Sequence, residues 1–153
     1  MKPAFAADRT LGRLVKWLRL MGFDTVFESD ATACTYKAFR SSDRILLTRI
    51  HRALDNCPSQ RGILIGANEP SRQIRQVIAH LKLDYGTLDP YTRCLRCNTE
   101  LVATRRSDVF GKVPDYVWET QAQFNQCLCC DQIFWRGSHI QRSRHKLYEL
   151  FSA

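Results

Sequence analysis

The stretches Cys94-Leu95-Arg96-Cys97 and Cys127-Leu128-Cys129-Cys130 are two Cys-x-x-Cys pairs in the second half of the chain. Two such pairs can surround one zinc ion with four thiolates, because each pair grips the metal from a tight turn. The chain between the pairs then has to return the second pair to the first. We therefore predict a structural zinc site with the ligands Cys94, Cys97, Cys127 and Cys130. The alternative for these residues is two disulfides.

The N-terminus lacks the charged and then apolar pattern of a secretion signal. We therefore expect a cytoplasmic protein, and in that reducing compartment thiolates bind metal rather than oxidise. The separation of the two pairs is longer than the commonest spacing, which predicts an excursion of the ribbon over residues 101–124. Cys129 is then a bystander, and Cys34 and Cys57 are expected to be ordinary buried thiols. Asn98, directly after the first pair, is expected to satisfy backbone groups of its own turn.

The composition favours an anionic partner. The 153 residues include 23 Lys and Arg against 15 Asp and Glu, which gives a formal charge of +8. A charge of this size is typical of proteins that bind RNA or DNA, although it also serves solubility alone. The sequence contains no apolar run of the length needed to cross a bilayer.

Residues 1–88 alternate between short apolar runs and segments with helical periodicity. Predicted strands cover residues 3–7, 24–27, 44–48 and 62–65, and predicted helices cover residues 10–22, 31–40, 51–56 and 71–81. This alternation predicts a three-layer α/β domain with a mainly parallel sheet and a groove beyond the carboxyl ends of its strands. Residues 89–153 would form the zinc-ribbon domain, with a helix over 115–124, a strand over 133–135 and a helical tail over 140–151.

Local signals set the expected helix ends. Thr10 is expected to cap the first helix and Gly22 to end it in a left-handed conformation, and Ser71 is expected to cap the helix over 71–81. The first helix carries basic side chains on the face opposite its apolar stripe: Arg13, Lys16 and Arg19, with Arg9 just ahead. These four residues are candidates for contacts with RNA phosphates, and the alternative is a solvated basic face.

Asp8 follows the first predicted strand, where a parallel α/β fold presents side chains to a ligand. A carboxylate at this place can hold a hard cation such as magnesium. The alternatives are a helix cap or a salt bridge to Arg9 or Arg13. Metal-dependent cleavage of a phosphodiester needs several acids together, and Asp30 and Glu69 also lie near predicted element ends.

Ordered motifs along nearly the whole chain carry a family resemblance. They are Asp8-x-x-Leu11-Gly12-Arg13-Leu14-x-x-Trp17-Leu18-Arg19-x-x-Gly22-x-Asp24, then Arg44-Ile45-Leu46-Leu47-Thr48-Arg49, then Arg93-Cys94-x-x-Cys97-Asn98, and Cys127-x-x-Cys130 with Trp135-x-Gly137-Ser138-His139. Together they resemble the Mut7-C RNase domain family. The resemblance implies a PIN-like nuclease fold with a C-terminal zinc ribbon, in which acids gather magnesium or manganese to hydrolyse RNA. By position, Asp8 resembles the first metal-binding acid and Asp30 a second.

One position departs from the family pattern. The family usually has Asp after Leu-Thr-Arg, whereas this chain has Ile50, which cannot coordinate a cation. Glu69 is the candidate to take the place of a later acid. Three functions follow: a magnesium- or manganese-dependent ribonuclease, an RNA-binding module that does not cut, and a zinc-ribbon adaptor that docks proteins. PIN-like nucleases often pair, so a homo-oligomer is compatible with the resemblance, but no segment specifies an interface.

Overall fold

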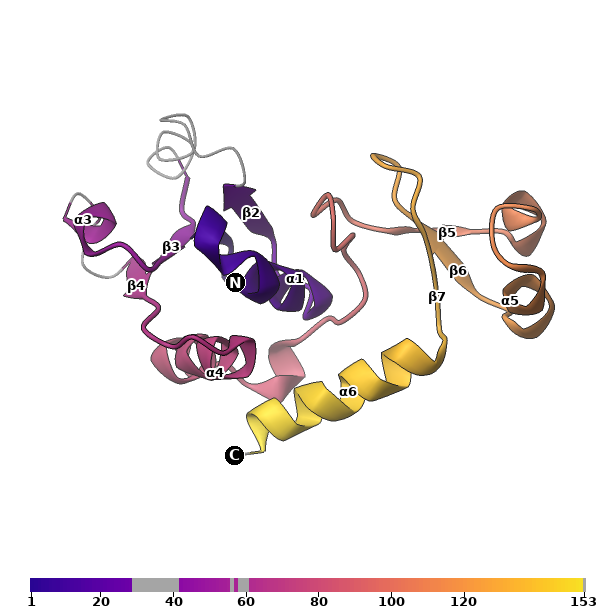
Figure 1. The fold of residues 1–153 in the computed structure, drawn as a ribbon. Helices are drawn as coiled ribbons and strands as arrows, with labels where there is room; N and C mark the ends of the chain where they lie inside the picture. Colours follow the sequence, from indigo (N-terminus) through magenta and orange to yellow (C-terminus); the bar gives the residue numbers. More distant parts are fainter. Residues whose placement is uncertain (29–41, 56, 58–60, 153) are drawn as a thin grey trace.

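The first half of the chain forms a parallel sheet in a computed structural model, which describes residues 1–28, 42–55, 57 and 61–152 (Figure 1). Its strands are β1 (Phe5–Asp8), β2 (Thr25–Glu28), β3 (Ile45–Thr48) and β4 (Gly62–Leu64). They lie in the order β2-β1-β3-β4, and each neighbouring pair is parallel. The chain adds β2 on one side of β1 and then crosses over to add β3 and β4 on the other side, so the strand order reverses between β1 and β3. The predicted mainly parallel sheet is confirmed.

Helices cover both faces of this sheet. On one face, α1 (Gly12–Leu20) and α4 (Pro70–Leu81) pack over a core that includes Phe5 and Ala7 of β1. On the other face, the short α3 (His51–Leu54) covers Ala6 and Leu46. Successive residues of a strand point to opposite faces, so the run of apolar residues in β1 fills both cores. The expected three-layer α/β architecture is confirmed.

The helix ends differ in part from expectation. Asp8, not Thr10, caps the first turn, which is a 3-10 segment over Arg9–Leu11 that precedes α1. Likewise α4 begins with Pro70 directly after Glu69, so Ser71 lies inside the helix and does not cap it. Proline suits this first helical position because its missing N–H would have no partner there. Gly22 has the predicted left-handed conformation, with φ of 86°.

The second half forms a small antiparallel ribbon. Its strands β5 (Val102–Thr104), β6 (Phe124–Gln126) and β7 (Ile133–Trp135) lie in that order. The excursion between β5 and β6 carries a 3-10 turn (Arg106–Val109) and α5 (Asp115–Thr120). Phe124, expected at the end of a helix, instead opens β6 and is buried with Val117 in the core of the ribbon. Burial in this small core overrides the helical pattern that precedes it.

The chain returns from the ribbon to the first core through α6 (Ser138–Phe151), drawn in yellow in Figure 1. Leu147 and Leu150 of α6 are buried among the side chains of the α/β core. The segment between α4 and the ribbon, residues 82–93, includes a 3-10 turn over Tyr85–Thr87. It also contacts α6, because the Tyr91 hydroxyl donates to the carbonyl of Ile140 at 3.1 Å. The division at residue 88 stays a prediction, and α6 contributes to the core of the first part. Among the described helices, none has both the length and the apolar character that a membrane span requires.

Candidate functional site

Asp8 ties the ends of β1 and β3 together. Its carboxylate is 3% exposed and accepts four hydrogen bonds. Oδ1 accepts from the N–H of Thr10 at 2.8 Å and from the hydroxyl of the same residue. Oδ2 accepts from the Thr48 hydroxyl at 2.7 Å and from the N–H of Arg49 at 2.9 Å. In parallel sheets of this type ligands bind beyond the carboxyl ends where the strand order reverses, and Asp8 lies at that point.

These hydrogen bonds decide the charge of Asp8. Burial opposes its ionisation, but the hydroxyls of Thr10 and Thr48 and the two backbone N–H groups outweigh burial and lower its pKa. The group is therefore a carboxylate at neutral pH. A carboxylate offers about four acceptor positions, and the donors from Thr10, Thr48 and Arg49 occupy this number. The structure thus bears out the alternative of a helix cap, while a role in metal binding stays a prediction.

A groove of about 950 Å³ opens beside this edge of the sheet. The surfaces of α1, the segment after β3, the start of α4 and the ribbon line it. Thr10, a partner of Asp8, is part of the lining. The exposed cations of the lining are Arg13, Lys16, Arg49 and Arg96.

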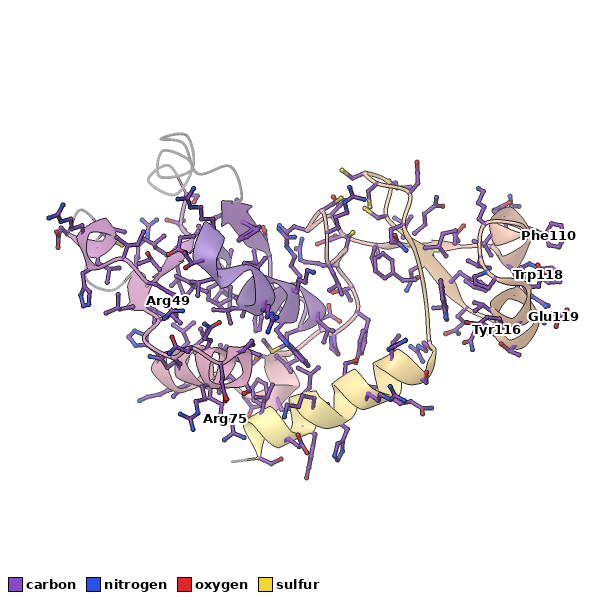
Figure 2. The ribbon with its side chains drawn as sticks, in the orientation of Figure 1. Arg49, Arg75, Phe110, Tyr116, Trp118 and Glu119 are labelled. Carbon is purple, nitrogen blue, oxygen red and sulfur yellow. The ribbon has the colours of Figure 1, made fainter. Side chains whose placement is uncertain are left out.

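Three of the residues predicted to contact RNA line this groove, the exposed Arg13 and Lys16 and the buried Arg19, and Arg9 is exposed but outside the lining. Sequence reasoning missed Arg49, labelled in Figure 2, and Arg96. The position of Arg49 directly after a buried strand was the available signal for it. Arg96 stands between the cysteines of the first pair, and its contribution depends on the folding of the ribbon against α1.

Arg19 has a structural role that the sequence did not predict. It is 7% exposed, and its Nε donates to the carbonyl of Thr25 at 3.0 Å. Its Nη1 donates to the carbonyls of Leu95 and Arg96, each at 2.9 Å. The guanidinium therefore holds the turn between Cys94 and Cys97 against α1 and β2. Contact of Arg19 with RNA stays a prediction.

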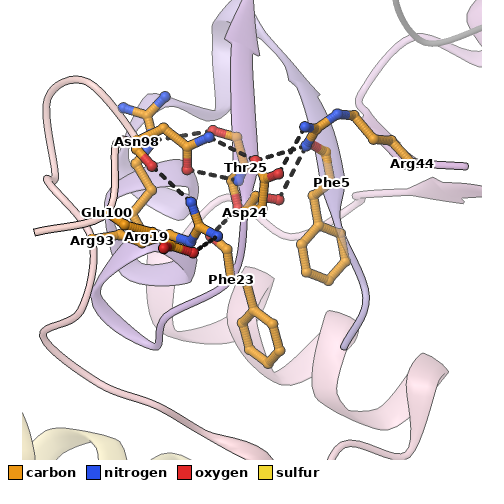
Figure 3. Close-up of polar contacts among 9 residues, drawn as sticks. All are labelled: Phe5, Arg19, Phe23, Asp24, Thr25, Arg44, Arg93, Asn98 and Glu100. Atoms are coloured by element: carbon orange, nitrogen blue, oxygen red, sulfur yellow. Dashed lines mark hydrogen bonds and ion pairs between the residues drawn. The ribbon is translucent and has the colours of Figure 1, made fainter. Parts of the chain in front are cut away.

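Asn98 makes a second link between this turn and the sheet (Figure 3). Its Oδ1 accepts from the N–H of Thr25 at 2.9 Å, and its Nδ2 donates to Asp24 at 2.7 Å. Arg44 donates to both carboxylate oxygens of Asp24, at 2.9 and 2.8 Å. Burial opposes ionisation of Asp24, but the bonds from Arg44 and Asn98 lower its pKa. The expectation that Asn98 serves its own turn is therefore wrong, because its side chain reaches across to β2.

The four predicted zinc ligands lie together. Their sulfur atoms are within 4.8 Å of one another, and those of Cys94 and Cys130 are 3.7 Å apart. Tetrahedral zinc with Zn–S bonds of about 2.3 Å separates thiolate sulfurs by about 3.8 Å. The six cysteines that the structure describes are free thiols, and Cys129 is exposed beside the cluster. The arrangement is compatible with zinc and offers no support for two disulfides; Cys34 lies outside the described residues.

Both Cys-x-x-Cys turns have the same backbone. The N–H of Asn98 donates to the carbonyl of Cys94, and the N–H of Asp131 donates to the carbonyl of Cys127, both at 2.9 Å. Asn98 and Asp131 have left-handed φ values of 66° and 61°. This repetition would let each pair of sulfurs approach a metal ion from equivalent directions.

The protonation of the cluster also favours a cation. Burial opposes ionisation of Cys127, but the N–H groups of Cys130 and Cys129 outweigh it and lower its pKa to about 7. The hydrogen bond with Cys130 raises the pKa of Cys97, and burial raises that of Cys94. The Cys127 thiolate therefore forms readily, and a divalent cation would favour ionisation of Cys94 and Cys97.

The acids in the described ranges do not form a comparable group. Glu69 has a side chain that is 70% exposed and that pairs with Arg72 at 3.7 Å. Asp30 lies outside the described residues, and Ile50 is 48% exposed after β3. Within the described part of the chain, the cysteines are the one set of three or more close metal-ligating side chains. Of the candidate acids that the structure describes, Asp8 is the one buried at the carboxyl edge of the sheet, and a catalytic magnesium or manganese site stays a prediction.

Comparison with known proteins adds a family. A family model described as the Mut7-C RNAse domain matches residues 3–147, which include the groove and the four clustered cysteines. No curated protein and no solved structure gives a significant match. The description of the family indicates a ribonuclease-type function. Because the match covers nearly the whole chain, this protein belongs to the Mut7-C RNAse domain family.

Proposed function

We propose that this protein is a ribonuclease that binds RNA in the groove and hydrolyses it at the edge of the sheet beside Asp8. The observation that carries the proposal is the meeting of a basic groove with the reversal point of a parallel sheet. Four exposed cations on three separate elements can neutralise successive phosphates. Thr10, which binds Asp8, also lines the groove, so this carboxylate lies directly behind the proposed RNA path.

The proposed catalytic metal is magnesium or manganese, with Asp8 and Asp30 as its acids. When bound there, such an ion would activate water and stabilise the leaving oxygen. Asp8 can take part only if the hydroxyls of Thr10 and Thr48 give up their hydrogen bonds to it, because its acceptor positions are occupied. The role of Glu69 remains a weaker part of this proposal, because it already pairs with Arg72.

A second candidate function is RNA binding without cleavage. The occupied carboxylate of Asp8 and the apolar, exposed Ile50 favour it. An acid at position 50 would stand beside the end of β3, two residues after the Thr48 hydroxyl that binds Asp8. The groove and its cations serve both candidates equally, so cleavage and binding have to be measured separately.

The test is cleavage of labelled single-stranded RNA by zinc-loaded protein, with magnesium or manganese either added or omitted. Omission is preferable to EDTA, because a chelator would also remove zinc from the cysteines. The informative variants are Asp8→Asn and Ile50→Asp. Thr48→Val is the matched control, since it removes one hydrogen bond to Asp8 and keeps the acid.

Each outcome selects one function. Metal-dependent cleavage that Asp8→Asn abolishes and Thr48→Val retains, with both variants folded by circular dichroism, supports the ribonuclease. Binding without cleavage in the wild type, with cleavage gained in Ile50→Asp, supports the second candidate. Wild-type protein that neither binds nor cuts RNA refutes both.

A further inference from the structure

We propose that the ribbon wall of the groove is a stacking site for an unpaired nucleobase, with Phe134 as its platform. This inference rests on the proposed binding of RNA and goes further, because it assigns the substrate class to single-stranded RNA. It also gives the zinc ribbon a direct part in binding. The argument uses the orientation of one strand, the position of the cations and the shape that unpaired RNA presents.

The alternation along β7 turns Phe134 toward the groove. Ile133 and Trp135 pack in the core of the ribbon together with Phe124 and Val117. Side chains of successive strand residues point to opposite faces, so Phe134 lies on the face away from that core. Phe134 is half-buried and lines the groove beside Gln132. A large apolar ring is thus presented to a basic groove, away from the core that its neighbours fill.

Cations line both walls of the same groove. Arg13 and Lys16 lie on α1, and Arg96 lies on the ribbon, between two of the clustered cysteines. The carbonyl of Arg96 is fixed by Arg19, which anchors this turn to α1. Phosphates on either side of a stacked base would therefore meet positive charge. A basic groove with an aromatic platform is the combination that binds single-stranded nucleic acids.

The same features disfavour a duplex. Bases in an A-form helix are stacked on one another, so their faces are closed to a side chain. An aromatic ring inside a groove adds to the free energy of RNA binding only when a base can leave such a stack. Single-stranded RNA therefore gains the contact with Phe134, and double-stranded RNA of the same length keeps only the phosphate contacts.

The experiment measures binding of a labelled ten-nucleotide RNA to the full, zinc-loaded chain without magnesium or manganese. Phe134→Leu keeps an apolar side chain of similar reach and removes the aromatic face, and Phe134→Trp keeps that face. Tyr116→Ala is the matched control, because Tyr116 is a 68% exposed aromatic residue at the far end of the ribbon (Figure 2). A second RNA with central abasic sites keeps the phosphates and lacks the bases.

We expect Phe134→Leu to weaken binding of the intact RNA roughly 5- to 150-fold, the range for loss of one aromatic stack. Phe134→Trp and Tyr116→Ala should bind like the wild type. The abasic RNA should bind the wild type more weakly than the intact RNA, and Phe134→Leu should remove most of this difference.

Two failures are distinguishable. Equal binding of the intact RNA by the wild type and Phe134→Leu, together with weaker binding by an Arg13→Ala variant, overturns the stacking site and leaves the proposed function standing. Preference of the wild type for duplex RNA overturns the stacking site as well. Absence of RNA binding by the wild type refutes the proposed function itself.

Discussion

Replacing Asn98 tests how the ribbon is joined to the sheet. Asn98→Gly removes the amide that accepts from the N–H of Thr25 and donates to Asp24. Glycine adopts the left-handed backbone of this position, with φ of 66°, without strain. The substitution therefore isolates the two side-chain hydrogen bonds from the conformation of the turn.

The magnitude follows from the burial of the two partners. Thr25 is 0% exposed, and leaving its N–H without an acceptor costs about 1–3 kcal/mol. The bond to ionised Asp24 contributes about 1.5 kcal/mol, at the low end of the range for charged partners, because the side chain of Asp24 is 33% exposed. We expect a loss of about 2.5–4.5 kcal/mol in the free energy of unfolding, or roughly 5–18 °C in melting temperature for a chain of this length.

Urea unfolding of zinc-loaded protein measures this loss, and Asp131→Gly is the matched control. Asp131 has the equivalent left-handed position in the second Cys-x-x-Cys turn, with φ of 61°, but its side chain is exposed. Its replacement should change the unfolding free energy by less than about 0.5 kcal/mol. If Asn98→Gly is as mild as this control, the side chain does not join the ribbon to the sheet and the reasoning is refuted.

Three further predictions concern the metal, pH and the last helix. Cys127→Ser should abolish the binding of a single zinc ion, measured by atomic absorption. It should also lower the melting temperature, because structural zinc contributes roughly 10 kcal/mol of apparent binding free energy. An unchanged melting temperature would contradict a structural zinc. Asp24 has a lowered pKa in the folded protein, so its stabilising effect is present above its unfolded value of about 3.9 and is lost as pH falls through the folded value. Urea unfolding of wild type should therefore lose more free energy below about pH 4 than unfolding of Asp24→Asn, and parallel pH profiles would exclude this role. Leu147→Ala should lower the free energy of unfolding by about 2–5 kcal/mol, because Leu147 is fully buried. Faster hydrogen exchange of the β1 amides would locate this loss in the first core. Unchanged exchange of these amides would show that α6 is not part of that core.

Much of the fold was predictable because its signals are local. The apolar runs that form β1 and β3 are buried on both faces of the sheet, and the apolar residues of each strand are enough to predict this burial. The cluster of four cysteines was predictable for a related reason, since each Cys-x-x-Cys pair is a complete local turn. Asp8 was found from its place at a strand end, although its carboxylate proved to be a cap with four donors.

The remaining features depend on contacts between distant segments. Arg19 lies three residues after Lys16, so helical periodicity placed both on one basic face. The carbonyls that Arg19 binds belong to Leu95 and Arg96, and the sequence of α1 does not predict these distant partners. A groove beyond the carboxyl ends of the strands was predicted, but its full set of cations was not, because they come from α1, from the end of β3 and from the ribbon.

Because α6 returns to the first core, the ribbon is attached to the α/β part of the chain at both of its ends; we call each attachment a closure. One closure is the pair of links from Arg19 and Asn98, and the other is the burial of Leu147 and Leu150. If one closure opens, the other keeps the ribbon at a high effective concentration near its place, so the wall of the groove re-forms quickly. A ligand that enters the groove therefore meets a surface that lost its conformational entropy during folding, and little further ordering opposes binding.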